Sequence, residues 1–425
     1  MTILCITLLI CFLLNVPIAF SLAISTAVAL LASGSSNMST VPQMMVAGIN
    51  SFALLAIPFF MMAGTIMERG GVSKRIISFA DTLIGHIRGG LGAVTVVSCA
   101  FFAAISGSTP ATAAAIGGLM IPEMKKRGYD DDYSSAIVAS ASCLGVIIPP
   151  SIPMVVFGVT AGVSVGKLLL GGFIPGIFLA FLLILTNYFL SKKYNFPTGT
   201  KKSFKEIWLA FKNAIWALLM PVIIMGGILG GIFTPTESAC VAVIYGIFVG
   251  LFVYKELRLK DLIDLAYKAA LGSAMVMLLI ACSKPLGWLL TSEQIPRIVS
   301  SFVLSLSANK YIIYVLVMVV LLFLGCLMET SSIILLTVPI LQPIMVGLGV
   351  DMIHFGVICV VNLAIGMLTP PVGVALFTTA GISKVTMGQI IHKVWPMLFV
   401  LILGMFIMVF FPSIVTFLPE LLMSS

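Results

Sequence analysis

Gly145-Val-Ile-Ile-Pro149-Pro150 lies deep in one apolar stretch of this chain, and Gly366-Met-Leu-Thr-Pro370-Pro371 lies deep in another. The two segments align without a gap at a shift of 221 residues. The same shift superposes further residues of the same type upstream: Pro122 on Pro343, Gly128 on Gly349, Asp130 on Asp351 and Ile137 on Ile358. Two related halves, each with a membrane segment broken by Gly and Pro, are typical of secondary transporters.

The composition places the chain in a membrane. Of its residues 60% are hydrophobic and 9% charged, and the mean hydropathy is +1.20, whereas soluble domains are roughly a quarter charged. Apolar runs near the length that spans a bilayer recur from end to end. The N-terminal stretch has no basic n-region, so we expect a membrane segment there rather than a cleaved signal peptide. The chain is therefore an integral membrane protein of all-α type, with about 10–11 spans.

The positive charge follows membrane topology and does not indicate nucleic-acid binding. The net charge is +8, and the basic residues lie in short clusters between apolar runs, as the positive-inside rule predicts. The main clusters are Arg69/Lys74/Arg75/Arg88, Lys125-Lys126-Arg127, Lys192/Lys193/Lys201/Lys202/Lys205 and Lys255/Arg258/Lys260/Lys268. All eight cysteines lie in apolar stretches without a CxxC pair, so we interpret them as packing residues.

This charge pattern predicts two re-entrant helical hairpins. If the four basic clusters face the cytoplasm, segment 92–121 enters and leaves on one side, with its tip near Ser106–Pro110. The related segment 311–347 has its tip near Glu329–Ser332 and flanks that are poor in basic residues, so it opens to the outside. The halves are then inverted, as in alternating-access carriers. We interpret segments 76–88 and 293–308 as amphipathic interfacial helices.

Four pieces of irregular backbone are therefore expected at membrane depth, which is tolerated only where they are buried or line a polar cavity. Proline frees carbonyls in the preceding turn, and carbonyls with Ser and Thr hydroxyls suit a hard monovalent cation. We predict two sodium sites. The first comprises Ser106, Ser108, Thr109, Gly145, Ile148 and Pro150, and the second comprises Gly325, Thr330, Ser331, Ser332, Gly366, Thr369 and Pro371. The alternative is that these are kinks whose hydroxyls only help helices to pack.

The helix N-termini at the tips offer N–H groups to an anionic substrate. The candidate substrate-binding residues are Ser108, Ser151, Glu329, Asn362 and Lys284. Glu329 is an ionisable group expected at membrane depth, which makes it a functional candidate. The alternative is that the tip reaches the interface and that Glu329 is simply hydrated. Lys284 interrupts an apolar span; it either attracts the substrate, snorkels, or pairs with Glu237. Asn362 either lines the cavity or bonds another helix, and we expect Glu237 to cap a helix that begins near Thr234.

Enzyme chemistry is not indicated by the sequence. His86, His354 and His392 are scattered, and the chain has no HExxH or CxxH pattern, so no transition-metal site is predicted. No P-loop, GxSxG or Rossmann fingerprint occurs in a plausible context. We expect no organic cofactor and no hydrolysis of ATP.

Several motifs together resemble one family, the large membrane (M) subunit of TRAP (tripartite ATP-independent periplasmic) transporters. The resemblance covers essentially the whole chain and is carried by Ser106-Gly-Ser-Thr-Pro-Ala-Thr-Ala-Ala-Ala-Ile-Gly117, Met120-Ile-Pro-Glu-Met-Lys-Lys-Arg-Gly-Tyr129, Ile148-Pro-Pro-Ser-Ile-Pro153, Gly231-Ile-Phe-Thr-Pro-Thr-Glu237 and Asn362-Leu-Ala-Ile-Gly-Met-Leu-Thr-Pro-Pro-Val-Gly373. It implies a bacterial inner-membrane carrier of organic acids that is driven by sodium. It also implies two partners, a periplasmic binding protein and a small four-helix Q subunit.

The family resemblance further implies an elevator-type carrier, in which a transport domain moves against a scaffold. The expected division is 1–91 scaffold and first arm helix, 92–163 transport domain, 164–310 linker, scaffold and second arm helix, 311–381 transport domain, and 382–425 C-terminal scaffold helix. Many dicarboxylate-type relatives carry an acidic residue after the first tip. Here Pro110-Ala-Thr112 stands there, which favours sialic acid as substrate.

Other functions remain open at this point. The first alternatives are a TRAP transporter for C4-dicarboxylates and a stand-alone divalent-anion/sodium symporter that needs no binding protein. A scaffold subunit or a channel is a different class. The duplicated broken helices argue against both, because neither needs paired ion cages.

Overall fold

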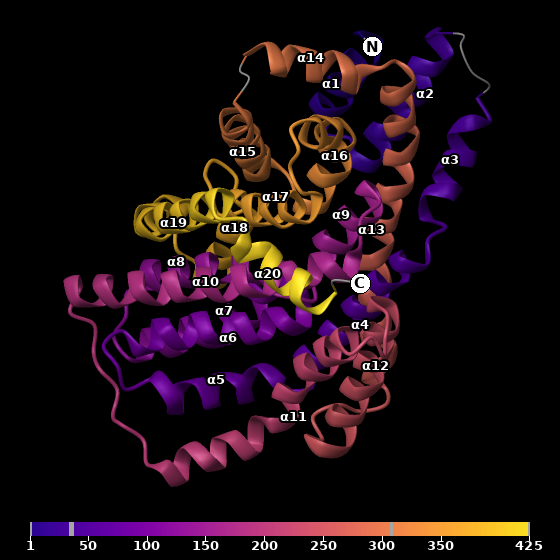
Figure 1. The fold of residues 1–425 in the computed structure, drawn as a ribbon. Coiled ribbons are helices and arrows are strands. Elements are labelled where there is room, and N and C mark those ends of the chain that lie inside the picture. Colours follow the sequence, from indigo (N-terminus) through magenta and orange to yellow (C-terminus); the bar gives the residue numbers. More distant parts are fainter. Residues whose placement is uncertain (1, 34–37, 307–308, 424–425) are drawn as a thin grey trace.

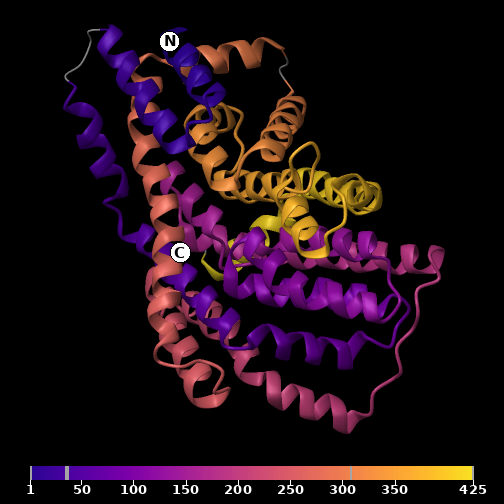
Figure 2. The same cartoon turned by 180° about the vertical axis from the view of Figure 1, so that it is seen from behind.

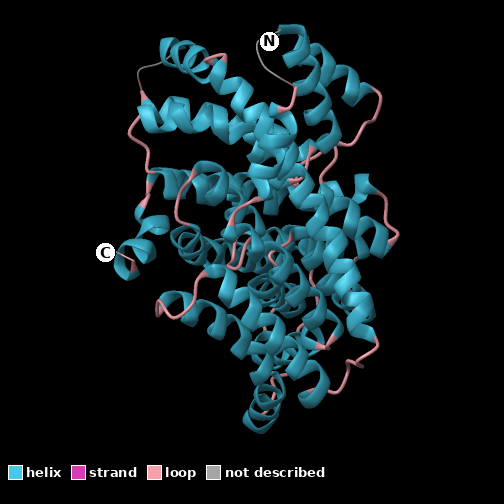
Figure 3. Ribbon diagram, turned by 90° about the vertical axis from the view of Figure 1, so that its right-hand side faces the viewer, coloured by secondary structure: helices cyan, strands magenta, loops and turns pink. Residues whose placement is uncertain are grey.

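The computed structural model describes residues 2–33, 38–306 and 309–423. Its regular elements are helical (Figures 1 and 3), with an isolated β-bridge between Arg88 and Thr198. The first half contains α1 (Thr2–Leu13), α2 (Ile18–Ser33), α3 (Thr40–Ile49), η1 (Phe52–Leu55), α4 (Ala56–Arg69), α5 (Val72–Ile84), α6 (Gly90–Ser106), α7 (Thr109–Lys126), α8 (Asp131–Ser142), η2 (Cys143–Val146), α9 (Ile152–Ala161) and α10 (Val165–Lys193). The second contains α11 (Phe204–Leu229), α12 (Pro235–Phe248), η3 (Val249–Val253), α13 (Asp261–Ser292), α14 (Ile295–Leu306), α15 (Lys310–Leu327), α16 (Thr330–Gly347), α17 (Met352–Gly366), α18 (Val374–Ser383), α19 (Met387–Phe410) and α20 (Ser413–Leu422).

Within the described residues, eight helices are long and apolar enough to cross a membrane. The broken segments appear as shorter helices, because the Pro-Pro pairs separate α8 from α9 and α17 from α18. Both Pro-Pro bonds are cis. The count of 10–11 spans stays a prediction. Segments 76–88 and 293–308 contain much of α5 and α14, and residues 307–308 lie outside the described part.

The repeat seen in the sequence extends to the backbone. Helices α7 and α16 both have 18 residues and are related by the same shift, as are their starts at Thr109 and Thr330. Gly128 and Gly349 both adopt positive φ, of 83° and 68°, a conformation that favours glycine. Each precedes an aspartate at the N-cap position of a broken helix, α8 or α17.

The hairpins and broken helices pack as one body. Helices α8 and α17 are its centre: every residue from Tyr133 to Ser142 and from His354 to Gly366 is buried. Helices α10 and α19 pack against α8 and α17, although the sequence grouped both with the scaffold. The physical reason is that α8 and α17 are buried on all sides and need long apolar helices around them.

The remaining helices form a second group. Helix α13 runs along one side of the molecule with α2, α3 and α4 beside it (Figures 1 and 2), and α12 packs against α4. The two groups meet where α4 contacts α6 and where α13 contacts α16. The first hairpin also contacts α5 and α11, and the second also contacts α14.

The halves exchange partners. The second arm of each hairpin packs against the helix that follows the break of the other half: α7 against α18, and α16 against α9. The Gln342 amide donates to the Ala161 carbonyl at 2.8 Å. Cys143 and Ala364, which are 221 residues apart, contact each other at 3.1 Å. A residue meets its own counterpart only near a pseudo-two-fold axis, so that axis passes between the two broken helices.

Candidate functional site

The first hairpin turns at Gly107. Its φ is 61°, and its N–H donates to the Ala103 carbonyl at 3.2 Å, which ends α6. Ser108 is extended, and α7 begins at Thr109 with Pro110 in its first turn, where proline is favoured because its missing N–H is not needed. The Ser-Gly-Ser-Thr-Pro sequence therefore produces a tight tip at the predicted place.

Oxygen atoms gather at this tip. The Ser106 and Thr112 hydroxyls are 2.9 Å apart. Because Thr112 gives its hydroxyl hydrogen to the Ser108 carbonyl at 2.8 Å, Ser106 donates to Thr112. The Thr109 hydroxyl is buried and has no hydrogen-bond partner in the structure. A buried polar atom without a partner is costly and calls for an explanation.

The first break lies directly against the tip. A Cβ placed on Gly145 would lie 2.6 Å from both the Ser108 carbonyl oxygen and the Thr112 hydroxyl. A Cβ on Gly107 would lie 2.8 Å from the Pro150 carbonyl oxygen, and the Ile152 N–H donates to the Gly107 carbonyl at 3.4 Å. Glycine is thus required at both contacts, and the predicted groups of the first site meet.

Two residues predicted near this site have structural tasks. Ser151 caps α9: its hydroxyl donates to the Val146 carbonyl at 2.5 Å and accepts from the Met154 N–H at 3.3 Å. The Ile148 N–H donates to the Leu144 carbonyl. Ser151 is fully buried, so its hydroxyl is committed to the backbone of the break.

The first cluster suits a sodium ion. It offers hydroxyls of Ser106, Thr109 and Thr112 and the Ser108 carbonyl, which are hard, neutral oxygen donors. The described residues contain no group of three or more His, Cys, Asp or Glu that would hold a transition metal. The orphaned Thr109 hydroxyl is the observation that favours a bound cation.

The second tip is built differently. Glu329 occupies the N-cap of α16, and its carboxylate accepts from the backbone N–H groups of Ser331 at 2.8 Å and Ser332 at 3.3 Å. The Ser331 hydroxyl also donates to Glu329, at 3.1 Å. Glu329 is exposed, whereas Thr330, Ser331 and Ser332 are buried. The carboxylate therefore satisfies the helix N-terminus, as capping residues do.

The second break contacts its hairpin through backbone. A Cβ on Gly366 would lie 2.6 Å from Gly325 Cα, so the two chains approach as closely as glycine allows. The Gly373 N–H donates to the Cys326 carbonyl at 3.2 Å. The Thr330 hydroxyl lies 3.1 Å from the Met367 sulfur. The predicted residues of the second site are again brought together, around a glycine contact.

Thr369 and Pro371 complete the second break. The Thr369 N–H donates to the Gly366 carbonyl at 2.8 Å, and its hydroxyl donates to the Ile365 carbonyl at 3.0 Å. Pro371 follows Pro370 in the cis bond and is exposed. The hydroxyl of Thr369 thus keeps its lone pairs available for a cation.

Asn362 lies one helical turn before the break. Its amide N donates to the Met318 carbonyl at 2.7 Å, which ties α17 to the first arm of the hairpin. Its amide oxygen is buried without a hydrogen-bond partner. Asn362 therefore makes the predicted hydrogen bond to another helix, and its amide oxygen remains as a free acceptor.

Lys284 lies away from the tips. It lines a cavity of about 550 Å³ together with Gly48 of α3 and Pro339 and Gln342 of α16. Pro339 is nine residues beyond Thr330, roughly 13 Å along the helix. Lys284 packs closely on Gly48, and it makes no ion pair with Glu237 in the described part of the chain.

Glu237 is the cap that the sequence predicts. The Thr234 hydroxyl accepts from the Glu237 N–H at 3.3 Å, and the Glu237 carboxylate accepts from the Thr234 N–H at 2.8 Å. This reciprocal capping box starts α12.

Sequence reasoning missed Thr112 and Gly64 as members of the first site. Thr112 bridges Ser106 and Ser108; its position one turn after Ser108, on the tip-facing side of α7, is a signal that was present. Gly64 of α4 lies against Ser106, where a Cβ would be 3.4 Å from Ser106 Cα. No sequence pattern marks that contact, because α4 belongs to the other group of helices.

The chain is similar to known transport proteins along its length. The family model described as "Tripartite ATP-independent periplasmic transporter, DctM component" matches residues 5–414. The C4-dicarboxylate TRAP transporter large permease protein DctM of Pseudomonas aeruginosa is 42% identical, over 87% of this chain and 86% of that protein. The sialic acid TRAP transporter large permease protein SiaM of Vibrio cholerae is 37% identical, over 96% and 95%.

A longer relative and a solved structure are also similar to this chain. The isethionate TRAP transporter permease protein DctMQ of Oleidesulfovibrio alaskensis is 42% identical over 95% of this chain, and the chain spans only 64% of its length. The crystal structure of the YdaH transporter of Alcanivorax borkumensis has a TM-score of 0.60, 16% identity, and 85% coverage of both chains. At that identity the likeness concerns the fold alone.

Proposed function

This chain belongs to the DctM family of tripartite ATP-independent periplasmic transporters, and from that membership we propose that it carries an organic acid across the membrane together with sodium. As a large TRAP permease with eight helices able to span, it is a multi-pass protein of the bacterial inner membrane. Proteins of this family are permeases, which agrees with the lack of catalytic motifs. The finer statements below concern coupling ion, substrate and partners.

Sodium coupling is supported chiefly by the first tip. The neutral oxygens of Ser106, Ser108 and Thr112, with the unpartnered hydroxyl of Thr109, meet the glycine of the first break. A cation bound there joins the hairpin to the broken helix, so the position of the tip depends on sodium. Each charge moved down 100 mV supplies about 2.3 kcal/mol for transport.

The second sodium site is proposed around Thr330, Ser331, Ser332, Gly366 and Thr369. These residues lie between the second tip and the second break. The N-termini of α7 and α16 are the positive ends that favour a substrate anion. The loaded hairpins then slide as an elevator against the α13 group, and we infer that the hairpins are re-entrant.

The substrate is an anion. We propose an acidic sugar such as sialic acid first, because the first tip continues as Pro110-Ala-Thr112 without an acidic residue. A C4-dicarboxylate is the second candidate: three relatives named for C4-dicarboxylate are 37%, 42% and 40% identical to this chain, and a relative named for sialic acid is 37% identical.

Two partners are proposed. One is the small four-helix membrane subunit: the relative whose name joins M and Q is longer, and this chain spans 64% of it, as expected if the rest of that protein supplies the small subunit. The other is the periplasmic binding protein after which the family is described. A stand-alone symporter needs neither.

The test is uptake into proteoliposomes that hold this chain and its small partner, under a sodium gradient, with and without the binding protein. Labelled sialic acid and a labelled C4-dicarboxylate are compared. Uptake that needs both sodium and binding protein supports the tripartite proposal and identifies the substrate. Sodium-driven uptake without binding protein indicates a stand-alone symporter. Uptake at the same rate with and without sodium overturns the proposed sodium coupling.

A further inference from the structure

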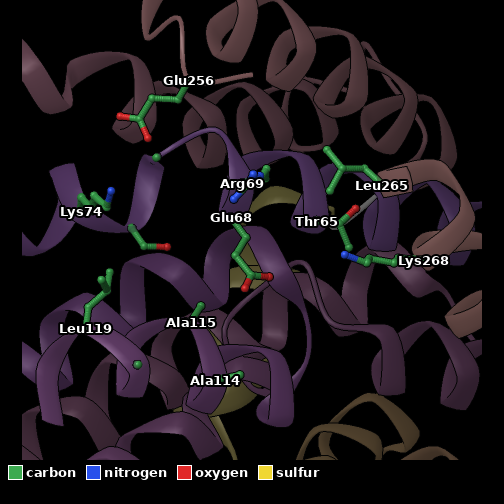
Figure 4. A pocket seen from close by; sticks show the side chains of 13 residues that line it. Thr65, Glu68, Arg69, Lys74, Ala114, Ala115, Leu119, Glu256, Leu265 and Lys268 are labelled. Carbon is green, nitrogen blue, oxygen red and sulfur yellow. The ribbon is translucent and has the colours of Figure 1, made fainter. Parts of the chain in front are cut away.

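A second polar cavity lies against the first hairpin. It has a volume of about 660 Å³ and is bounded by α4, α5, α7 and α13 (Figure 4). Glu68 and Arg69 of α4, Ser73 and Lys74 of α5, and Lys268 of α13 line it. Arg69, Lys74 and Lys268 belong to two of the basic clusters that the positive-inside rule assigns to the cytoplasm. The cavity therefore opens on the cytoplasmic side.

The two cavities are counterparts in the repeat. The shift of 221 residues relates the linings in pairs: Leu265 and Lys268 correspond to Met44 and Ala47, and Ala114 and Gly118 correspond to Leu335 and Pro339. The two linings differ most in charge. The Lys284 cavity has one cation and no carboxylate in its lining, whereas the cytoplasmic one holds Glu68, Arg69, Lys74, Glu256 and Lys268.

The cytoplasmic cavity contains the start of helix α5, and the Glu256 carboxylate lies against it. Helix α5 has 13 residues, and its N-cap is Gly71 at φ 79°, which supplies no side chain to cap it. Ser73 in its first turn is 97% buried, lines the cavity, and its hydroxyl has no hydrogen-bond partner in the structure. An orphaned donor beside the positive end of a helix is suited to an oxyanion.

The charged groups of the cavity are not equivalent. Glu256 is committed to Arg75, at 2.7 Å, and Lys268 to Asp264, at 2.9 Å. In the described part of the chain Arg69 and Lys74 make no ion pair, and both are exposed. Glu68 extends between Lys74 and Lys268 in Figure 4. An anion thus finds two uncommitted cations, the opposing carboxylate of Glu68, and a second carboxylate, Glu256, that is paired with Arg75.

The cavity also reaches the first tip. Thr65 of α4 lines it, and the preceding residue, Gly64, lies against Ser106. The wall of the cavity thus runs from the tip to the cytoplasmic end of α4.

We propose that this cavity is a second, low-affinity site for the carboxylate of the transported acid, occupied as the acid leaves for the cytoplasm. Ser73, Lys74 and Arg69 bind the carboxylate, and Glu68, with Glu256 at the start of α5, keeps the affinity low so that release is fast. The inference rests on the proposed function, because it takes the transported anion as its ligand.

The experiment measures binding of sialic acid and of succinate, one probe for each proposed substrate, to the purified full chain with its small partner, in detergent without sodium, by isothermal titration calorimetry. Without sodium the tip site is expected to be empty, so only the cavity contributes. Lys74→Gln is expected to raise the Kd about tenfold and Ser73→Ala about threefold, as losses of a charged and a neutral hydrogen bond. Glu68→Gln is expected to lower the Kd. Lys205→Gln, an exposed lysine on α11, is the matched control and is expected to leave the Kd unchanged.

Absence of saturable binding of both acids without sodium overturns the proposal, as does a Lys74→Gln Kd equal to that of the control. Binding of inorganic phosphate but of neither acid, with competition by phosphatidylglycerol and not by phosphatidylcholine nanodiscs, assigns the cavity to a lipid headgroup and also overturns it. Opposite shifts of the Kd for Glu68→Gln and Lys74→Gln support the proposal; if one of these variants does not fold, the Kd of the other against the control decides. Sodium-driven uptake by the unaltered chain is measured in parallel, so failure of the proposed function is recognised separately.

Discussion

The two hairpin tips share a backbone and differ in chemistry. Ser106, Ser108 and Thr112 of the first tip correspond to Leu327, Glu329 and Ile333 of the second, and among the hydroxyls that gather at the first tip only that of Thr109 has a counterpart, Thr330. Ser106 is 5% exposed, whereas Leu327 is 44% exposed. The repeat therefore maintains the helices, the glycine of each break and the cis prolines, whereas most of the tip hydroxyls stand at different positions in the two halves.

The difference teaches that symmetry of fold does not impose symmetry of sites. The first tip is packed against α4 and has an unpartnered hydroxyl; the second carries Glu329, whose carboxylate its own helix uses. On this basis we propose that the first half contributes the stronger of the two proposed cation sites, whereas the second tip is held by its cap.

The largest effect is expected from Gly366→Ala. The new Cβ would lie 2.6 Å from Gly325 Cα and 2.8 Å from the Gly325 carbonyl carbon. Because both of these atoms belong to the backbone, the hairpin and the break must separate. Overpacking of this kind costs about 1–3 kcal/mol or more, so we expect loss of uptake and a lower thermal midpoint. Gly347→Ala, where nothing lies within 4 Å, is the control. A Gly366→Ala protein with unchanged stability and uptake would show that the contact of Gly366 with Gly325 is looser than the contact of Gly145 with the first tip.

Thr109→Val is expected to separate ion binding from stability. Valine has the shape of threonine without the hydroxyl, so the change removes a buried unpaired group and leaves stability in sodium-free buffer unchanged or higher. Loss of one ligand is expected to raise the sodium concentration for half-maximal uptake about tenfold.

Thr330→Val is the matched change at the second tip and is expected to have the smaller effect on sodium dependence, because its hydroxyl already has the Met367 sulfur as a partner. The measurements are sodium titrations of uptake and of thermal midpoint. Equal effects of the two changes would contradict the asymmetry between the tips.

Glu329→Ala removes the cap of α16 and is expected to cost about 1 kcal/mol, the usual value of an N-cap. Glu329→Asp keeps a capping carboxylate and is expected to restore most of that stability. Thermal denaturation of both variants, with uptake measured beside it, is the check. If Glu329→Asp were as stable as the parent but inactive, Glu329 would bind substrate or ion rather than cap the helix.

The smallest effect is expected from Lys284→Gln. Lys284 lies some distance from both tips and acts on the substrate only through the charge of its cavity, and a single partly screened charge is worth less than about 1 kcal/mol. We expect KM to rise about twofold or threefold, with sodium dependence unchanged. A tenfold loss of uptake at saturating substrate would place Lys284 in direct contact with the transported anion.

Much of this arrangement could be predicted from the sequence because it rests on local signals. Gly107 and Pro110 define the first tip, the Pro-Pro pairs define the breaks, and Thr234 with Glu237 defines a capping box. Contacts between distant helices have no such signal. The grouping of α10 and α19 with the broken helices, the approach of Gly64 to Ser106, and the cap formed by Glu329 all depend on which helices become neighbours.

The exchange of partners between the halves has a consequence for biosynthesis. Helix α7 packs against α18, which begins about 250 residues later in the chain. At the usual pace of translation, the first hairpin waits roughly 12 to 50 seconds for that partner. During this time the face of α7 that later packs against α18 must be sheltered by lipid, by the insertion machinery or by a chaperone. A ribosome that stalls within the second half would therefore leave an incomplete chain whose first half is a target for membrane proteases.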